Sequence, residues 1–245
     1  MKFYKKKYWI IGASEGLGRA LAFQLSEMGA DLIVSARNEV RLKELSDLTK
    51  AKVLAFDVLD MDGVKQACKS VGKIDGIIYA AGDYTPMNSA TWNIDEVEKM
   101  IAINFTGAAR VLGLVIPKFL NQDYGHIVLI GSLSGFRGLP NAIGYGASKA
   151  GMMHLAENIK ADLYKSTIKV QLINPGFITT RLTEKNNFKM PFIMSADEAA
   201  NYVISAMKKN HFQTNFPYLF SLLFRATNFL PAFLYFWLFS SKNKK

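Results

Sequence analysis

The stretch Gly12-Ala13-Ser14-Glu15-Gly16-Leu17-Gly18 follows directly on the apolar run Tyr8–Ile11 and leads into the helical pattern Leu17–Met28. A strand, a glycine-rich turn and a helix N-terminus in this order form an anion site, because backbone N–H groups and the positive helix end face the same point. Gly12 permits the tight turn, Gly16 lets a pyrophosphate approach the backbone, and Gly18 lets the helix pack on the strand. The stretch therefore predicts a phosphate-binding turn.

Short apolar runs alternate with longer amphipathic stretches along most of the chain. The expected strands are Tyr8–Ile11, Leu32–Ser35, Val53–Phe56, Gly76–Ala80, Ile127–Ile130, Val170–Ile173 and His211–Phe216. The expected helices are Leu17–Met28, Val40–Thr49, Gly63–Val71, Asp95–Leu120, Tyr145–Tyr164 and Ala196–Lys208, the last with a capping box of Ser195 and Glu198. Such alternation builds right-handed βαβ units that form a parallel sheet covered by helices on both faces. We predict a doubly wound, Rossmann-type α/β domain of about seven strands over residues 1–217, and an apolar helical tail over residues 218–245.

The composition limits the classes of partner. The chain has 245 residues, a formal net charge of +10 and one cysteine, Cys68, so no internal disulfide is possible and a reducing compartment is expected. No helix-turn-helix, zinc-finger or RNA-binding signature accompanies the positive charge, and we expect no nucleic-acid partner. The lysines gather at the two chain ends, which leaves solubility and attraction to an acidic lipid surface as alternative explanations.

Two further features concern location and metals. The apolar run Tyr8–Ile11 is too short for the hydrophobic region of a signal peptide, so a cytoplasmic protein is expected. The histidines, His126, His154 and His211, lack metal-ligand spacing, and structural roles with no metal site are expected.

The end of the second expected strand bears on cofactor choice. NAD-specific sites usually carry an acidic residue there, which accepts hydrogen bonds from the ribose hydroxyls. This chain reads Ser35-Ala36-Arg37-Asn38 instead. A guanidinium pairs with a 2′-phosphate that a carboxylate would repel. Arg37 therefore favours NADP(H) over NAD(H), with Ser14, Asn38 and Arg41 as helpers, and the alternative is that Arg37 is a solvated residue at the start of a helix.

A tyrosine and a lysine lie at i and i+4 in Tyr145-Gly146-Ala147-Ser148-Lys149, on one face of an expected helix. A free tyrosine has a pKa near 10, and an adjacent ammonium lowers that value toward neutrality. Ser132 follows the strand Ile127–Ile130, where its hydroxyl can hold a substrate oxygen while Tyr145 transfers a proton.

From Lys7 to about Phe216 the chain resembles the short-chain dehydrogenase/reductases. The resemblance rests on the glycine turn, Asp57-Val58, Ala81-Gly82, Asn104, Ser132, Tyr145, Lys149 and Asn174-Pro175-Gly176, all in the family's order. The sequence departs from the family at Ile11, where threonine is usual, and at Tyr79-Ala80, where two asparagines normally brace the sheet.

The resemblance implies a role for each matching residue. Tyr145 would be the general acid/base, Lys149 would lower its pKa and hold the nicotinamide ribose, Ser132 would orient the substrate oxygen, and Asn104 would support a proton-relay water. The implied cofactor-binding residues are Gly12, Ser14, Glu15, Gly16, Leu17, Gly18, Arg37, Asn38, Asp57, Val58, Ala81, Gly82, Asn104, Tyr145, Lys149, Pro175, Gly176, Ile178 and Thr180. It also implies a homodimer or homotetramer, in which the two longest helices pair across a two-fold axis.

The tail after Phe216 is the most apolar and least family-typical part of the chain. Arg225, Asn228 and Pro231 interrupt it, leaving pieces shorter than the roughly 20 residues of a spanning helix. We expect two short helices, the second starting at Pro231. Its aromatic residues and lysine-rich end suit the membrane interface, on the inner face of a membrane, whereas a lid over the substrate pocket and a subunit interface are the alternatives.

Together these features predict an NADP(H)-dependent oxidoreductase that acts on a carbonyl or alcohol, and membrane contact would favour a lipophilic substrate. The alternative is a cofactor-binding sensor or membrane-associated scaffold with little turnover. A complete set of Asn104, Ser132, Tyr145 and Lys149 argues against that alternative.

Overall fold

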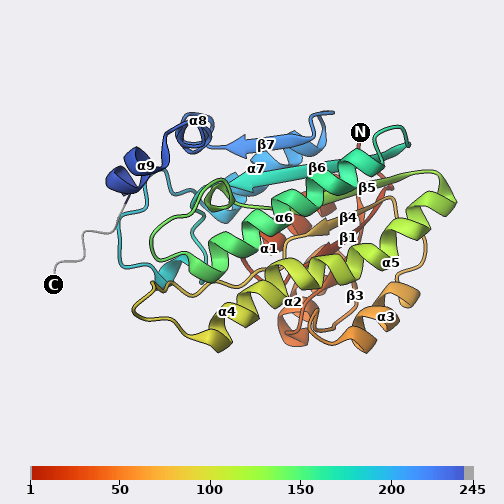
Figure 1. Ribbon diagram of the computed structural model, residues 1–245. Helices are drawn as coiled ribbons and strands as arrows, with labels where there is room; N and C mark the ends of the chain where they lie inside the picture. The colour runs from red at the N-terminus through yellow and green to blue at the C-terminus, as the bar shows by residue number, and fades with distance from the viewer. Residues whose placement is uncertain (1, 240–245) are drawn as a thin grey trace.

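The computed structural model describes residues 2–239 and contains one seven-stranded parallel sheet in the order β3-β2-β1-β4-β5-β6-β7 (Figure 1). The strands are β1 (Lys7–Ile11), β2 (Asp31–Ser35), β3 (Lys52–Val53), β4 (Gly76–Tyr79), β5 (Gly125–Ile130), β6 (Ile168–Pro175) and β7 (Gln213–Phe216). The order turns from decreasing to increasing numbers between β1 and β4, which is the switch point where doubly wound folds bind ligands. The predicted fold class is confirmed.

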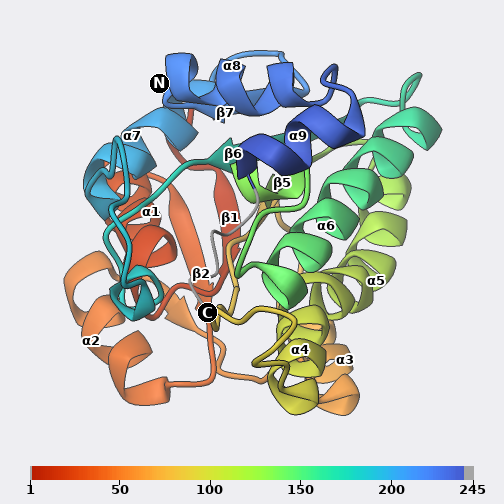
Figure 2. The ribbon, with the colours of Figure 1, turned by 60° about the vertical axis from the view of Figure 1, so that its left-hand side comes forward.

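Helices cover both faces of the sheet (Figure 2). They are α1 (Gly16–Glu27), α2 (Glu39–Thr49), α3 (Met61–Ser70), α4 (Ile94–Ile101), α5 (Gly107–Gln122), α6 (Ile143–Asp162), α7 (Ala196–Met207), α8 (Tyr218–Thr227) and α9 (Ala232–Phe239). Leu21, Leu42 and Val203 bring α1, α2 and α7 into one buried cluster, while Val64 and Val111 belong to a second cluster with α3, α5 and α6. The central strands are buried throughout, as their apolar runs predict. The capping box at the start of α7 is also confirmed.

The third strand is shorter than the expected Val53–Phe56. β3 pairs with β2 only through Lys52 and Val53, and β2 ends at Ser35. Single backbone hydrogen bonds from Leu54 and Phe56 continue toward β2. The chain then turns where the Asp57 side chain accepts a hydrogen bond from the Leu59 backbone N–H at 2.9 Å.

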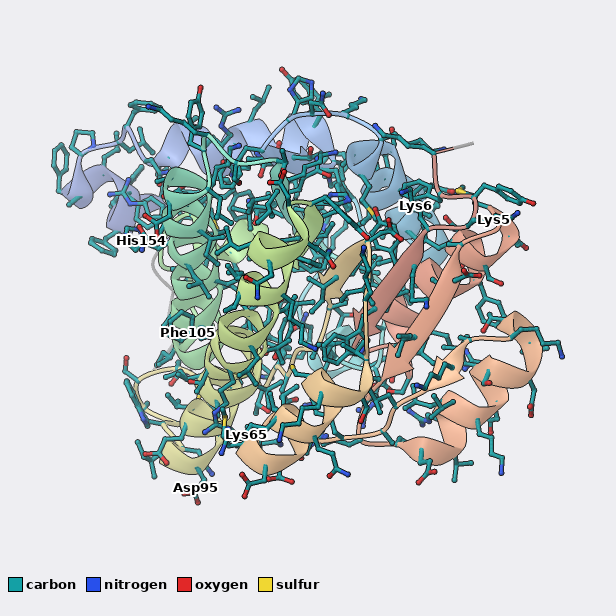
Figure 3. The ribbon with its side chains drawn as sticks, turned by 90° about the vertical axis from the view of Figure 1, so that its right-hand side faces the viewer. Lys5, Lys6, Lys65, Asp95, Phe105 and His154 are labelled. Atoms are coloured by element: carbon teal, nitrogen blue, oxygen red, sulfur yellow. The ribbon has the colours of Figure 1, made fainter. Side chains whose placement is uncertain are left out.

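The expected helix Asp95–Leu120 is a continuous helix over Ile94–Gln122 that contains one π-helical segment, η1 (Ala102–Thr106). Such a segment changes the backbone pairing, and the buried Tyr79 hydroxyl donates to the Ile103 carbonyl within it at 2.6 Å. Tyr79 thus supplies a brace between β4 and the helix. Phe105 of η1 also packs on α6, since a Cβ on Gly151 would lie 3.3 Å from its ring (Figure 3).

Among the described residues, Ile94–Gln122 is the one helix long and apolar enough to cross a membrane by length and composition. Its most apolar window is 44% buried, and η1 and α5 contribute to the core.

The tail forms the two expected short helices, α8 and α9. The second begins at Ala232, one residue after the predicted start, and the Pro231 carbonyl accepts hydrogen bonds from the Leu234 and Tyr235 backbone. α8 runs beside β7, and α9 lies beyond the carboxyl ends of the strands (Figure 1). The lysine-rich end of the tail lies outside the described residues.

Candidate active site

A cavity of about 1200 Å³ opens at the carboxyl ends of the strands. Its walls come from the segments that follow β1 to β6 and from the tail. All the predicted cofactor and catalytic residues line it except Asn104, which is fully buried behind it. Predicted residues as far apart in sequence as Gly12 and Thr180 therefore line one cavity.

The glycine turn, called the glycine cradle below, is packed too closely for side chains. Gly12 has φ +88°, and a Cβ there would lie 2.5 Å from the Ala81 backbone nitrogen. A Cβ on Gly18 would lie 2.1 Å from the Gly12 carbonyl oxygen, so only glycine allows α1 to approach β1 this closely. Gly16 has φ +55° and lies beside Thr180 in the cavity lining, where a Cβ would come within 3.0 Å of the threonine methyl group.

The N-terminus of α1 has no side-chain cap and no acidic residue in its first turn. By contrast, α2, α3, α4 and α7 are each capped by an Asn, Asp or Ser side chain. The first backbone N–H groups of α1 thus remain free of side-chain acceptors at the edge of the cavity. With the glycine cradle beside them, they fit the pyrophosphate of a dinucleotide.

Charged side chains surround this end of the cavity. The Glu15 carboxylate pairs with Arg41 at 2.5 Å and with Arg181 at 2.7 Å. Arg37 lies 3.9 Å from the Asp57 carboxylate and remains more than half exposed. Three guanidinium groups thus face two carboxylates, so this end of the cavity carries an excess of positive charge where a dinucleotide phosphate would lie. Arg181 was not among the sequence candidates, because its position beside Glu15 depends on how the chain after β6 folds back.

Asn38 has a structural task in addition to its predicted one. Its side-chain oxygen accepts a hydrogen bond from the Arg41 backbone N–H at 3.0 Å and caps α2. An asparagine at this position is a typical N-cap. The cap orients the start of α2, from which Arg41 reaches the cavity.

The catalytic candidates meet on the opposite wall, where β5 ends and α6 begins. Ser132 follows β5, and its hydroxyl oxygen accepts hydrogen bonds from the Ser134 backbone N–H and hydroxyl. Tyr145 and Lys149 share one face of α6, with the Lys149 ammonium 5.7 Å from the centre of the Tyr145 ring. The ammonium donates to the Ile130 carbonyl oxygen at 2.9 Å. The predicted i, i+4 geometry therefore holds.

The pKa of Tyr145 is raised, not lowered as the sequence predicted. Burial raises the pKa of Tyr145, and a hydrogen bond with Ser132 acts in the opposite direction. Burial also lowers the pKa of Lys149 to about 8. The sequence could not reveal this, because the degree of burial depends on the packing of α6 against β5. Tyr145 keeps its proton at neutral pH and is poised as an acid.

Asn104 acts through its side-chain amide on the wall of the cavity. It accepts from the Asp83 backbone N–H at 2.7 Å and donates to the Asp83 carbonyl at 3.0 Å and to the Ser148 hydroxyl at 2.9 Å. The segment after β4 and the catalytic helix are thereby tied to η1.

Sequence reasoning missed several cavity residues. Tyr84 packs edge-on against Tyr145, with ring centres 5.0 Å apart, and donates to Asn186 at 2.7 Å. The tail also reaches the cavity, through Phe220, Leu223, Phe224 and Phe239. The apolar pattern of the tail could suggest a lid, but only the position of α8 after β7 brings these particular side chains to the cavity.

The buried His126 lies outside the cavity and makes structural hydrogen bonds. His126 lies between the Tyr8 hydroxyl and the Gln171 side chain, each at 2.8 Å, and burial lowers its pKa to about 3. Within residues 2–239, no group of three or more His, Cys, Asp or Glu side chains is arranged to hold a metal ion.

The chain is similar to known oxidoreductases over most of its length. Residues 6–190 match the family model described as short chain dehydrogenase. An uncharacterized oxidoreductase from Myxococcus xanthus is 31% identical over 231 residues, covering 91% of each chain. Among solved structures, a short-chain dehydrogenase from Sphingobium yanoikuyae in complex with NADPH has a TM-score of 0.81 at 26% identity, covering 91% of this chain and 92% of that one. A short-chain dehydrogenase from Burkholderia cenocepacia in complex with NADP has a TM-score of 0.84 at 20% identity, covering 93% and 94%.

Proposed function

This chain belongs to the short-chain dehydrogenase family of NAD(P)-dependent oxidoreductases, and on that premise we propose that it transfers a hydride between NADP(H) and a lipophilic carbonyl or alcohol. One observation carries the proposal. Ser132, Tyr145 and Lys149 meet in a single cavity that has a glycine cradle at one end and an apolar wall from the tail at the other.

The catalytic side chains divide the work at the substrate oxygen. When bound, the nicotinamide supplies the hydride in reduction and accepts it in oxidation. The Ser132 hydroxyl holds the carbonyl oxygen, and the Tyr145 hydroxyl gives its proton to that oxygen as negative charge develops on it. Lys149 contributes a positive charge beside the resulting phenolate, which lowers the cost of the transfer. In oxidation the same groups act in reverse, with Tyr145 taking the alcohol proton.

Preference for NADP(H) is supported by the charges at the cradle. The cradle and the free N–H groups of α1 would hold the pyrophosphate, and Asp57 and Val58 would border the adenine. Arg37, Arg41 and Arg181 provide guanidinium groups that suit an additional phosphate. The Sphingobium relative, whose structure contains NADPH, adds support by similarity.

A lipophilic substrate is supported by the wall opposite the cradle. The Phe220 ring packs against Phe177, Phe192 and Phe224, with centres 5.0–6.1 Å apart. Of these side chains, Phe177, Phe220 and Phe224 line the cavity together with Leu223 and offer an apolar surface beyond the catalytic tyrosine. Burial of an alkyl or ring substituent against such a surface is energetically favourable.

Assembly and location form part of the same proposal. Within residues 2–239, no other helix or strand covers the outer face of α5 and α6, which suits a homodimer or homotetramer (Figure 3). A cytoplasmic protein with peripheral contact on the inner face of a membrane agrees with the single buried Cys68 and with the apolar tail.

The test is oxidation of NADPH, and separately of NADH, by the purified protein with ketones and aldehydes of increasing chain length. We expect turnover with NADPH that improves as the apolar group lengthens. Tight NADPH binding with no turnover on any carbonyl or alcohol would favour the sensor or scaffold alternative.

A further inference from the structure

The tail helices leave an unusual amount of apolar surface in contact with solvent. Six side chains make up what we call the tail face: Leu219, Leu222, Phe229, Phe233, Phe236 and Trp237. Phe229 is 90% exposed, Phe233 78% and Trp237 75%. Phe233, Phe236 and Trp237 lie on one side of α9, because residues three and four apart are neighbours on a helix.

α9 is apolar on every side, with the sequence AFLYFWLF. A helix of this kind is normally buried in a protein core or in a membrane. Here Tyr235 is its one fully buried side chain. The other apolar side chains of α9 are therefore not covered by an apolar partner within the described residues.

The opposite side of the tail is firmly attached to the catalytic domain. The Arg137 guanidinium stacks over the Tyr235 ring at 3.9 Å and donates to the Thr227 and Leu230 carbonyls, where α8 ends. The Tyr235 hydroxyl donates back to the Gly138 carbonyl at 2.6 Å. Arg137 and Gly138 lie between Ser132 and Tyr145 in the chain, so the tail is fixed to the loop that carries the site.

The charge of the tail identifies the partner. From Tyr218 to Lys245 the sequence has four basic residues and no acidic one: Arg225, Lys242, Lys244 and Lys245. The last acidic residue of the chain is Glu198. Aromatic and apolar side chains flanked only by cations are complementary to an anionic lipid surface, where each lysine adds about 1 kcal/mol of attraction.

A second copy of the chain fits this face less well. A two-fold interface sets the same patch against itself, and these tails would bring like charges together with no acidic partner. Within the described residues, α8 has 10 residues and α9 has 8, so both are much shorter than a membrane-spanning helix. The geometry therefore suits a segment that lies in the interface of a bilayer.

We propose that the tail face docks on anionic membrane surfaces and holds the active-site cavity open toward the lipid. The inner sides of the same two helices line the cavity through Phe220, Leu223, Phe224 and Phe239. A lipophilic substrate could then pass along apolar surface from bilayer to Tyr145. The docking deepens the proposed function, since only a lipophilic substrate gives it a catalytic use.

Vesicle co-sedimentation of the full-length protein tests the docking. We expect binding to phosphatidylglycerol-containing vesicles, weaker binding to pure phosphatidylcholine, and a loss of the difference at high salt. Phe233→Ser, Phe236→Ser and Trp237→Ser together should weaken binding at least about tenfold, because three large apolar groups leave the interface. The matched control carries Val40→Ser, Leu48→Ser and Tyr164→Ser, which remove exposed apolar groups elsewhere, and should bind as wild type does.

Fluorescence gives a second readout. Trp9 is fully buried, so in a Trp92→Phe background a blue shift on adding anionic vesicles reports on Trp237. Absence of vesicle binding, or equal binding by the tail-face variant, would overturn the proposal. So would a change of oligomeric state in that variant without any change in vesicle binding. NADPH turnover on a small soluble ketone, measured in parallel, separates this outcome from failure of the proposed function, because the three tail-face residues lie outside the cavity.

Discussion

Lys149 is a buried cation whose only hydrogen-bond partner within residues 2–239 is the Ile130 carbonyl. Desolvation penalises its charge and lowers its pKa from 10.5 to about 8. The unfolded chain therefore holds more protons than the folded protein between these two pH values. By linkage, the free energy of unfolding must rise with pH across this window.

We predict that this rise is smaller in Lys149→Met, which cannot titrate. Denaturant unfolding of both proteins would be followed from pH 7 to pH 10.5. The free energy of unfolding of the wild type, minus that of the variant, should be constant below about pH 8 and should increase above it. Taking the difference removes the contribution of Lys169, which burial also shifts to a pKa of about 8. A difference that does not change with pH would contradict the assignment.

Arg37 should decide the choice of cofactor. Loss of a charge-assisted pair with a phosphate typically costs about 1.5–3 kcal/mol, or roughly ten- to a hundredfold in affinity. We expect Arg37→Ala to weaken NADPH binding by that factor and to leave NADH binding unchanged, as measured by fluorescence titration. Lys43→Ala is the control, since it removes a cation of the neighbouring helix α2 that does not line the cavity. Equal losses of affinity for NADPH and NADH would show that Arg37 does not bind the 2′-phosphate.

At the residue scale, the sequence identified most of the site because the motifs have fixed spacing. Gly12, Ser132, Tyr145 and Lys149 each follow a strand or lie on one helix face, and a parallel sheet brings such positions together. Arg181 and Tyr84 were not predicted, because they belong to irregular loops with no periodic pattern. The direction of the Tyr145 pKa shift was not predicted, because it depends on the burial of the side chain.

Among the elements, α8 is the one that joins the catalytic domain to the tail. Its Phe220 and Phe224 side chains line the cavity, while Leu219 on the same helix is 77% exposed. One helix therefore presents an inner wall and an outer face.

We predict that Phe220→Ala lowers kcat/KM for long-chain carbonyls roughly ten- to a hundredfold, because a full aromatic contact contributes about 1.5–3 kcal/mol. NADPH affinity and turnover of a small ketone should be unchanged, since the cradle lies at the other end of the cavity. Leu219→Ala on the outer face is the matched control. Steady-state kinetics in which both variants lose activity equally on short and long substrates would exclude a substrate-binding wall.

The existence of each strand and helix was predictable, and the details of their ends were not. β3 pairs with β2 only through Lys52 and Val53, which depends on how the two strands meet in the folded sheet. The π-helical segment at Asn104 has no sequence signature in hydrophobic periodicity. The two tail helices were predicted from Pro231 and the polar interruptions, but their contacts with Arg137 depend on the completed fold.

At the scale of the whole molecule, the outer face of α5 is the surface on which assembly would depend. Gly113 lies there, exposed, with no atom within 4 Å of where its Cβ would be. We predict that Gly113→Arg converts an oligomer into monomers while the fold stays intact, because a bulky cation on each copy would repel its counterpart. Light scattering and circular dichroism measure the two quantities. A wild-type protein that is already monomeric at micromolar concentration would contradict the proposed assembly.

The central claim is that Tyr145 delivers a proton during NADPH-dependent carbonyl reduction. Its most direct test compares wild type and Tyr145→Phe in NADPH oxidation with a carbonyl substrate, alongside NADPH binding by fluorescence titration. Removal of a positioned acid typically slows turnover by about a hundred- to ten-thousandfold, and the phenyl ring preserves the packing against Tyr84. We therefore predict near-complete loss of turnover with NADPH affinity retained. A Tyr145→Phe protein that keeps more than about a tenth of the wild-type rate would contradict the assignment of Tyr145 as the acid.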